Sequence, residues 1–538
     1  MKTYRPTSEL AERILHEDHA LPTSGTIGLV DYMGGDESIA AAATLHHGPR
    51  IAGVRSVEDL LISLAHNDIW RPFQFAEVKL RFGMDLAGAQ HLVYRPEASI
   101  NQFSGRYSEF KEGSSDLRAL GASEELEAQH TSIAAKLFET YRELLSESLA
   151  KETARGVMLD TTNTSFFYKV NLAQLFETVE DLKRTSWKHD EERAVLADEL
   201  LGVARTVAPS AVEAYEAKHD GSTKDCIDWE RVARNAPNAV MTDASYPSRK
   251  ASETQRVVVP ELEDMLGYTT EPIRGGLVRV TDYMGDLHAI ADAARVSYKS
   301  GKKVSQDAAL VRTLLRDRHT TPFEMTELAF DVRMPLYIKR QSGRHRTLDQ
   351  AWFMGELAIA PERYVPTDED LAPQSNIDHQ GRGGAFDRDA QERIKERLAG
   401  TDRLLDEVKT EDPSLRDRLR PVDSWTRFSL KGDTHNLLHY VRLREDPHAQ
   451  LEIARYGTAF GNAMRAHVPV VMDAFDRFER QAVRFDRDEI AAIRSSGIEN
   501  GIKGIVDSAM ESGVFGTKPS ERRDAKIEEF KERLERIF

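Results

Sequence analysis

The feature that most constrains the fold of this chain is an internal repeat. The tetrapeptide Asp-Tyr-Met-Gly at residues 31–34 recurs at 282–285, and an Ala-rich run at 39–43 recurs at 290–294. The two copies therefore lie about 250 residues apart. A repeat means that one structural unit is built twice, so the fold has to be derived for one copy and then compared with the other.

Two further pairs of motifs keep the same spacing. Trp-Arg-Pro-Phe-Gln at 70–74 corresponds to Thr-Thr-Pro-Phe-Glu at 320–324, and Phe-Gly-Met-Asp-Leu at 82–86 corresponds to Val-Arg-Met-Pro-Leu at 332–336. Chance similarity between two segments would not preserve both order and spacing. We therefore interpret the chain as a tandem duplication.

Each copy has the pattern of an α+β unit. A second amphipathic helix is expected at 57–66 and at 307–316, before the Pro-Phe turn. The alternation of apolar and polar residues at 327–332 has the period of two that predicts a half-buried strand. Long helical segments are expected at 123–153 and 390–408. We predict two tandem domains, each a small antiparallel sheet with packed helices.

The repeat also sets the expected domain boundaries. They are an N-terminal lead-in at 1–23, the first copy at 24–219, a linker at 220–273, the second copy at 274–483 and a charged helical tail at 484–538. The linker mixes charges, Pro and Gly without periodicity. In the tail, Ile527, Phe530 and Leu534 form a narrow apolar stripe, which favours docking on the same protein.

Composition limits the class of partner. At 538 residues the chain is too long for one ordinary domain. Its net charge of −16 and the lack of a long basic segment argue against nucleic-acid binding. A single cysteine, Cys226, excludes an intrachain disulfide and fits a reducing cytosol. Without a signal core or an apolar run of about 18 residues, we expect a soluble cytoplasmic protein that binds no membrane.

One short basic cluster stands out in the second copy. Residues 340–346 read Arg-Gln-Ser-Gly-Arg-His-Arg, and guanidinium groups bind phosphate oxygens in pairs while staying charged. A solvated basic corner is the alternative for such a cluster taken alone. The first copy reads Gln-His-Leu-Val-Tyr-Arg-Pro at 90–96, so its Arg-His-Arg is lost.

The first copy carries a different anion-binding motif. Residues 99–108 read Ser-Ile-Asn-Gln-Phe-Ser-Gly-Arg-Tyr-Ser, which can offer a hydroxyl, backbone N–H groups and a guanidinium. The corresponding residues 349–357 contain neither Ser nor Arg, and the second copy reaches an Arg-Tyr only at 363–364. Each copy therefore keeps the anion-binding motif that the other has lost. Loss of function would remove residues at scattered positions, so this complementary pattern favours one site shared by both copies.

Together these motifs resemble the flavin-dependent thymidylate synthases. That family has a Gln shortly before Arg-His-Arg, found here at 341–346, and a Ser-x-Asn-Glu-x-Ser-x-Arg-Tyr run, found at 99–107. Further matches lie at 293–297, 319–324, 437–440, 443–444 and 449–453 in the second copy, and at 152–155 and 171–172 in the first. The resemblance covers roughly residues 25–215 and 275–480.

The resemblance implies methylation of dUMP to dTMP, with FAD as cofactor, methylenetetrahydrofolate as carbon donor and NADPH as reductant. By position, Arg444 would be the catalytic arginine. The substrate would be bound by Gln341, Arg344, Gln102, Phe103, Ser104, Gly105, Arg106 and Arg155. FAD would be bound by Ser297, Thr321, Glu324, Arg344, His345, Arg346, Asn101, Gln102, His435 and His439.

In that family the enzyme is a homotetramer with each nucleotide between subunits. Here the first copy has Leu182 at the position of Arg444, and the second has Asp417 at the position of Arg155. We therefore expect complete sites only where unlike copies meet, and a homodimer that imitates the tetramer. Two departures from the family are Gln102 in place of Glu and Asp433 near a place where Asn is usual.

Several alternatives stay open. The second copy has about seven extra residues between Arg346 and Arg363, which could plug an unused site or adapt the pocket to another pyrimidine nucleotide. A non-catalytic flavin- or nucleotide-binding protein is the third possibility. His435 and His439 are four apart, but no third ligand is placed to complete a metal site, so we expect none. Cys226 lies outside every motif and is a poor nucleophile.

Overall fold

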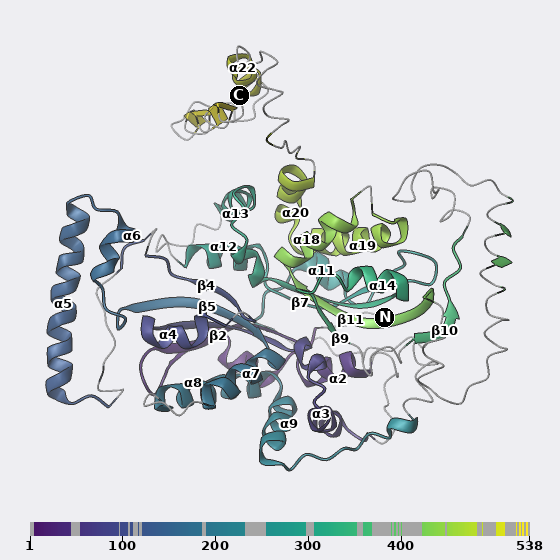
Figure 1. Cartoon of the computed structure of the whole chain (residues 1–538), viewed down its shortest axis with the longest axis horizontal. Coiled ribbons are helices and arrows are strands. Elements are labelled where there is room, and N and C mark those ends of the chain that lie inside the picture. The colour runs from purple at the N-terminus through teal and green to yellow at the C-terminus, as the bar shows by residue number, and fades with distance from the viewer. Residues whose placement is uncertain are drawn as a thin grey trace. The chain divides into compact units, whose positions relative to one another are not determined.

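The computed structural model of the chain divides into a large unit, Met1–Phe475, and a small C-terminal unit, Asp476–Phe538 (Figure 1). The structure describes residues 5–44, 54–95, 97–105, 108–110, 121–184, 190–231, 254–296, 306–351, 359–367, 422–446, 449–480 and 502–511, with isolated positions elsewhere.

The first copy forms a five-stranded antiparallel sheet in the order β1-β2-β3-β5-β4. Its strands are β1 (Asp18–Ala20), β2 (Thr26–Met33), β3 (Glu77–Asp85), β4 (Ser99–Gln102) and β5 (Asn163–Asn171). Its helices are α1 (Glu9–Ile14), α2 (Asp36–Thr44), α3 (Val57–His66), α4 (Leu86–Val93), α5 (Glu124–Ser146), α6 (Lys151–Ala154), α7 (Leu172–Lys183), α8 (Asp190–Val207) and α9 (Pro209–Asp220), with short 3-10 turns η1 (Arg71–Phe75) and η3 (Arg155–Val157).

The second copy repeats this plan, with strands in the order β10-β11-β8-β7-β6 and β9 paired with β11. Its strands are β6 (Thr269–Thr270), β7 (Leu277–Met284), β8 (Glu327–Pro335), β9 (Asp349–Ala351), β10 (Ile359–Arg363) and β11 (Ser424–Asp433). Its helices are α11 (Pro260–Met265), α12 (Leu287–Arg295), α13 (Asp307–Arg316), α14 (Leu336–Ser342), α18 (Thr434–Arg444), α19 (Leu451–His467) and α20 (Pro469–Phe475), with the 3-10 turn η5 (Thr321–Met325). The predicted pair of α+β domains is confirmed.

The duplication extends to an irregularity in pairing. The ladder between β2 and β3 shifts register between Leu29 and Asp31, and the ladder between β7 and β8 shifts between Val280 and Asp282. A bulge bends a strand and tightens its twist, and it is a designed feature rather than a defect. Both copies therefore inherit the same bend immediately before the Asp-Tyr-Met-Gly motif.

Each copy begins earlier in the chain than the predicted boundaries at 24 and 274. Helix α1 and strand β1 lie within the segment predicted as a lead-in, and α11 and β6 lie within the predicted linker. Each strand pairs with the first long strand of its own sheet. These short elements share few residue types, which is why sequence comparison missed them.

The predicted helix at 123–153 is two helices, α5 and α6, because Ser148 takes a positive φ of 64° between them. The predicted helix at 390–408 falls mostly outside the described residues. In the small unit, α22 (Ile502–Glu511) is helical, and Leu534 of the predicted stripe is buried.

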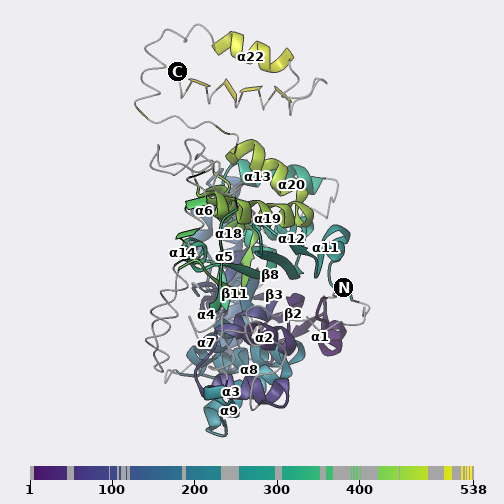
Figure 2. The ribbon, with the colours of Figure 1, turned by 90° about the vertical axis from the view of Figure 1, so that its right-hand side faces the viewer.

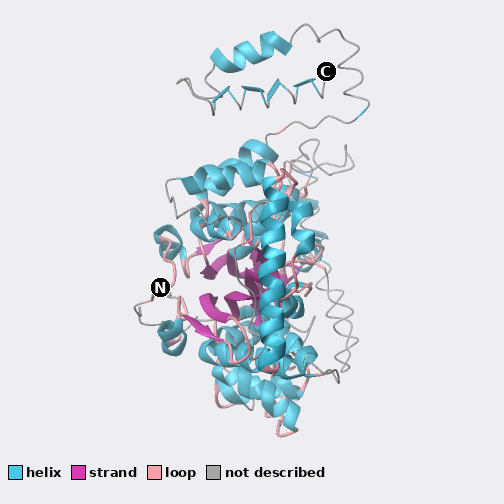
Figure 3. Cartoon of the chain, turned by 90° about the vertical axis from the view of Figure 1, so that its left-hand side faces the viewer, coloured by secondary structure: helices cyan, strands magenta, loops and turns pink. Residues whose placement is uncertain are grey.

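The central strands of the large unit are buried on both faces. Val78, Leu80 and Phe82 of β3 pack into the helix-lined core of the first copy, whereas the alternate residues Glu77 and Lys79 point the other way and are equally buried. Figure 3 shows the strands gathered between layers of helices, and Figure 2 shows α2, α8 and α9 on one side and α12, α19 and α20 on the other. The prediction of a half-buried strand at 327–332 is therefore wrong about exposure, because Glu327 and Asp331 face protein.

The repeated Asp-Tyr-Met-Gly motifs hold the two copies together reciprocally. The Gly34 N–H donates to Asp282 Oδ2 at 2.9 Å, and the Gly285 N–H donates to Asp31 Oδ2 at 3.0 Å. Met33 and Met284 pack together with Ala329 beside these bonds. The motif recurs because each copy supplies the same half of a two-fold contact.

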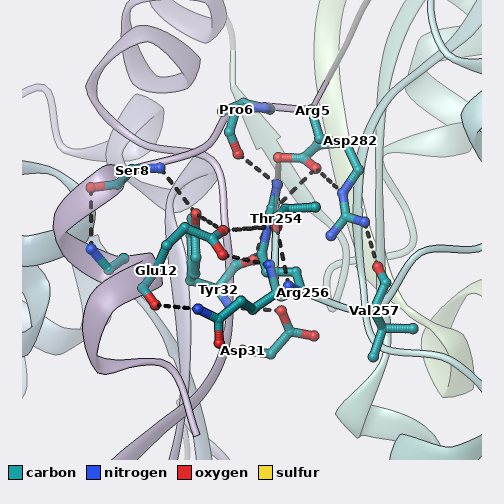
Figure 4. A network of polar contacts seen from close by, with 12 residues as sticks. Arg5, Pro6, Ser8, Glu12, Asp31, Tyr32, Thr254, Arg256, Val257 and Asp282 are labelled. Atoms are coloured by element: carbon teal, nitrogen blue, oxygen red, sulfur yellow. Dashed lines mark hydrogen bonds and ion pairs between the residues drawn. The ribbon is translucent and has the colours of Figure 1, made fainter. Parts of the chain in front are cut away.

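Two buried arginines add a second reciprocal contact (Figure 4). The Arg5 guanidinium lies 3.8 Å from the Tyr283 ring, and that of Arg256 lies 4.4 Å from the Tyr32 ring, distances typical of cation–π contacts. Arg256 also donates to the Tyr32 carbonyl at 2.9 Å and to the Pro6 carbonyl at 2.6 Å. The start of each copy is therefore fastened to the other copy.

A quartet of charged side chains is buried between the sheets. Glu77 and Lys169 come from the first copy, and Glu327 and Lys431 occupy the same strand positions in the second. Each lysine contacts both glutamates, with 3.3 Å between Lys169 and Glu77 and 3.7 Å between Lys431 and Glu327. Burial by itself would raise the pKa of Glu77, but the two lysines outweigh it and hold that pKa below its usual value.

The glycine of the motif gives a testable prediction. Gly34 has φ +74°, and a Cβ there would lie 2.1 Å from the Phe75 carbonyl oxygen. We expect Gly34→Ala to cost about 1 kcal/mol in backbone strain and a further ~1–3 kcal/mol from the clash and the weakened bond to Asp282. Urea unfolding measures this loss in the free energy of unfolding.

The matched control is Gly221→Ala. Gly221 has nearly the same φ, +76°, but nothing lies within 4 Å of its Cβ position. Only the strain component is expected there. Equal losses at the two positions would mean that the contact between the copies contributes nothing.

Candidate active site at the junction of the two copies

The predicted catalytic arginine lies in a polar cluster of the second copy. Arg444, at the end of α18, donates from Nε to His345 Nε2 at 3.1 Å and from Nη2 to the Gln341 carbonyl at 2.8 Å. Gln341 in turn donates from Nε2 to Gln450 Oε1 at 2.6 Å, just before α19 begins. The segment from Gln341 to His345 therefore fixes the guanidinium group directly, and Gln450 holds the side chain of Gln341.

Two glycines let the end of α18 approach α19. A Cβ on Gly457 would lie 3.0 Å from the Arg444 backbone carbon, and one on Gly461 would lie 2.8 Å from Glu445 Oε1. Small residues four apart form a shallow groove on a helix, which permits close packing. The sequence analysis missed this Gly-x-x-x-Gly pattern, although its spacing within a helix could have revealed it.

His345 is held neutral. It is buried, and burial, together with the neighbouring Arg444 and His439, lowers its pKa to about 4. Because its Nε2 accepts the hydrogen bond from Arg444, the ring proton must lie on Nδ1. The imidazole therefore orients the guanidinium without adding a second positive charge.

The remaining basic residues of the cluster face outward. Arg344 and Arg346 are exposed on the turn after α14. His439 is also exposed, its ring centroid lies 5.5 Å from that of His345, and burial of part of the ring with nearby Arg442 lowers its pKa. These groups present two permanent positive charges and a neutral imidazole at the surface.

The segment that the sequence predicts as an anion clamp begins at the end of β4 in the first copy. Gln102 ends β4, and Phe103 then packs against Phe110 with ring centroids 5.2 Å apart. A Cβ on Gly105 would lie 2.4 Å from Phe110 Cε2, so a larger residue there would have to displace the Phe110 ring. Phe110 shares a small apolar cluster with Ala154, the residue before exposed Arg155. The structure therefore brings Arg155 to the clamp loop.

The two copies meet where β4 contacts η5, a contact that we call the β4–η5 junction. Asn101 donates from Nδ2 to the Thr321 carbonyl at 3.0 Å, and Ser99 forms a hydrogen bond with the Glu324 carboxylate. Helix α18, which carries His435, His439 and Arg444, also packs against η5. This junction therefore connects the strand that precedes the clamp segment with the helix that carries Arg444, within one chain. Arg106 and Ser297 lie outside the described residues.

The corresponding position in the first copy is occupied by an arginine. Arg95, which replaces His345, donates from Nε to the His91 carbonyl at 3.3 Å and forms an ion pair with Asp181. His91 corresponds to Gln341, whose carbonyl binds Arg444 in the second copy. The second copy has its arginine, Arg444, at the end of helix α18. The first copy instead has Arg95 in the loop after α4, where Asp181 neutralises its charge. The sequence showed the loss of Arg-His-Arg but not this ion pair.

These features define a class of protein: a duplicated α+β fold whose two unlike copies keep different arginine-bearing motifs. A family model described as "Thymidylate synthase complementing protein" matches residues 28–210 and 279–470, one segment in each copy. The chain belongs to this family, that of the flavin-dependent thymidylate synthases, as a tandem pair. The predicted resemblance is confirmed.

Relatives match one copy's length at a time. The flavin-dependent thymidylate synthase of Wolbachia pipientis wMel is 37% identical over 249 residues, covering 45% of this chain and 88% of the relative. That of Ruegeria pomeroyi is 38% identical over 254 residues, covering 45% and 84%. A crystal structure of the UMP/dUMP methylase PolB from Streptomyces cacaoi matches 38% of this chain and 95% of its own, with 24% identity and a TM-score of 0.35.

The residues present fit a flavin dinucleotide. Guanidinium groups donate without accepting and stay charged, which suits a pyrophosphate, and Arg344 and Arg346 are exposed beside the neutral His345. Within the part of the chain that the structure describes, no three His, Cys, Asp or Glu side chains converge as a metal site requires. No described helix is long and apolar enough to cross a membrane.

Proposed function

We propose that the chain is a flavin-dependent thymidylate synthase that converts dUMP into dTMP, with methylenetetrahydrofolate as carbon donor and NADPH as reductant. The observation that carries this proposal is the fixed guanidinium of Arg444, held by His345 and Gln341 in the copy that lacks the anion clamp. Membership of the family supports the reaction type. Bound FAD supplies the hydride chemistry.

The residues of the chain bind and polarise the nucleotide. Arg155, Ser104 and the Gly105 N–H bind the 5′-phosphate, because a guanidinium, a hydroxyl and a backbone donor together match its oxygens. Arg444 lies beside the pyrimidine ring and stabilises negative charge that develops on it. A donor fixed in advance does not have to reorganise during the reaction, which is the main source of such stabilisation.

Thr321, Asn101, Arg344 and Arg346 would hold FAD near the β4–η5 junction, and His345 keeps Arg444 oriented. The junction supports this assignment because it joins predicted flavin residues of both copies, Asn101 and Thr321, within one chain. The clamp and the Arg444 cluster would face one another across two chains in a homodimer.

We expect one FAD per chain, because the Arg95–Asp181 ion pair occupies the corresponding position in the first copy. The test is to purify the protein, count flavin by its absorbance per chain, determine native mass, and incubate with methylenetetrahydrofolate, NADPH and either dUMP or UMP. The expected result is a yellow dimer with one FAD per chain that makes dTMP.

Other results would redirect the proposal. Conversion of UMP in place of dUMP would show that the substrate is another pyrimidine nucleotide. Two tightly bound FAD per chain would refute the expectation that the first-copy position binds none. A colourless protein that fails to support growth of a thymidine-requiring strain would favour a non-catalytic role.

A further inference from the structure

One acidic side chain distinguishes the two junctions between the copies. Glu324 lies half-buried in η5, next to β4. Gln74 lies half-buried at the same position of η1, next to β9. The copy whose turn carries the predicted flavin residue Thr321 therefore has a titratable carboxyl group where the other copy has a neutral amide.

Within the described residues, the charges near Glu324 leave its carboxylate poorly compensated. Asp433, which caps α18 by accepting from the Asn436 N–H at 2.8 Å, places a second negative charge nearby. The charge of Lys169 opposes this effect on the pKa of Glu324, but the Lys169 ammonium already contacts Glu77 and Glu327.

Three further elements pack against Glu324's turn. Helix α18 carries the titratable His435 in its first turn. Helix α12 brings Arg295 and His288, and both are paired with Asp307. Strand β4 offers the Ser99 hydroxyl, which is neutral. Burial, followed by the charge of Asp433, raises the pKa of Glu324 to about 7.

At the other junction, where β9 contacts η1, the acidic and the neutral positions are exchanged. Asp349 occupies the position of Ser99, and it lies 3.1 Å from the Lys431 ammonium and accepts from Asn171 Nδ2 at 3.1 Å. Asn171 in turn occupies the position of Asp433. There Asp349 is directly paired with Lys431, which it shares with Glu77 and Glu327, and burial still raises the pKa of Asp349. Its neighbours Gln74 and Asn171 carry no charge. Among the residues that the structure describes, the β4–η5 junction is thus the one of the two whose acid, Glu324, has no cation paired with it directly.

We propose that Glu324 takes up one proton from solvent when an anionic ligand binds at the β4–η5 junction, so that a neutral carboxyl group faces the ligand. An ionised Glu324 would repel a pyrophosphate, whereas the neutral acid can donate a hydrogen bond. The identity of the ligand, FAD, rests on the proposed function. The proton uptake itself rests on the arrangement of charges.

The direction of the pH effect follows from linkage. Below about pH 7 Glu324 is already protonated, and binding takes up no proton. Above that pH binding takes up as much as one proton, and the affinity for FAD falls by up to about tenfold per pH unit. Titration calorimetry of FAD-free protein at pH 8, in buffers with different ionisation enthalpies, measures the number of protons directly.

The variants separate the possibilities. Glu324→Gln keeps the shape of the side chain and should abolish both the proton uptake and the pH dependence of affinity. The matched control Gln74→Glu, at the equivalent position of the first copy, should leave both as in the unmodified protein. Ser99→Ala removes a bond that stabilises the ionised form, so uptake should persist with its midpoint at higher pH.

The outcomes distinguish this inference from the proposed function. FAD binding without proton uptake at pH 8, or uptake that survives in Glu324→Gln, would overturn the inference and leave the function intact. Absence of FAD binding at any pH would contradict the proposed function first.

Discussion

Arg444→Ala is expected to lower kcat/KM for dTMP formation by about 10²–10³ while leaving the protein folded. Arg444 presents a fixed positive charge whose orientation is set by His345 and the Gln341 carbonyl. Removing one preorganised donor of this kind costs about 3–4 kcal/mol of transition-state stabilisation in other enzymes. Steady-state kinetics at saturating FAD, with circular dichroism as a check on folding, measures the loss.

Two further variants show whether charge or geometry matters at Arg444. Arg444→Lys keeps the charge but not the planar fork, so most of the activity should still be lost. Arg184→Ala removes an exposed arginine from the end of the equivalent helix α7, where its partners are Glu180 and Asp181. It should leave kcat/KM unchanged. Full activity in Arg444→Ala would remove this residue from the catalytic role.

Lys169→Met is expected to lower the free energy of unfolding by about 3–5 kcal/mol. The Lys169 ammonium contacts Glu77 and Glu327, and all three groups are buried. Removing one partner of a buried ion pair leaves the opposite charge without water or a counter-ion. Urea unfolding monitored by fluorescence gives the difference from the unmodified protein.

A lysine on the surface provides the comparison. Lys183 forms a 2.9 Å ion pair with Asp198, but both side chains are largely exposed. Lys183→Met should therefore cost no more than about 1 kcal/mol. Adding Glu327→Leu to Lys169→Met should recover part of the loss, because the double variant removes the uncompensated charge. A loss in Lys169→Met no larger than in Lys183→Met would show that the quartet does not stabilise the fold.

Much of the fold could be predicted because its signals are local. The alternation at 327–332 predicted a strand, and the repeated Pro-Phe turns predicted η1 and η5, since period and turn chemistry depend on neighbouring residues. The loss of Arg-His-Arg at 94–96 likewise showed that the copies are unlike. Helix α1 and strand β1 were missed because they are short and poorly patterned.

The candidate site was predictable as a set of motifs but not as an arrangement. Comparison of the copies pointed to His345 and Arg444, yet nothing near either residue in the sequence indicates that one bonds to the other. In the sequence, the presence of Arg95 in the first copy at the position of His345 indicated only that the Arg-His-Arg motif had been lost. Its ion pair with Asp181 became visible only when two segments 86 residues apart were brought together.

The sequence by itself determined that the chain is a duplicated α+β protein with two unlike copies, because motif order, strand period and turn residues are properties of adjacent positions. Only the tertiary structure showed that the polar faces of the central strands pack against the other copy. Glu327 alternates with apolar residues as an exposed residue would, yet it is buried against Lys169, 158 residues away. A contact between distant segments of the chain leaves no periodic trace in either of them. The sequence could therefore specify which side each residue faces, but not whether water or the other copy lies on that side.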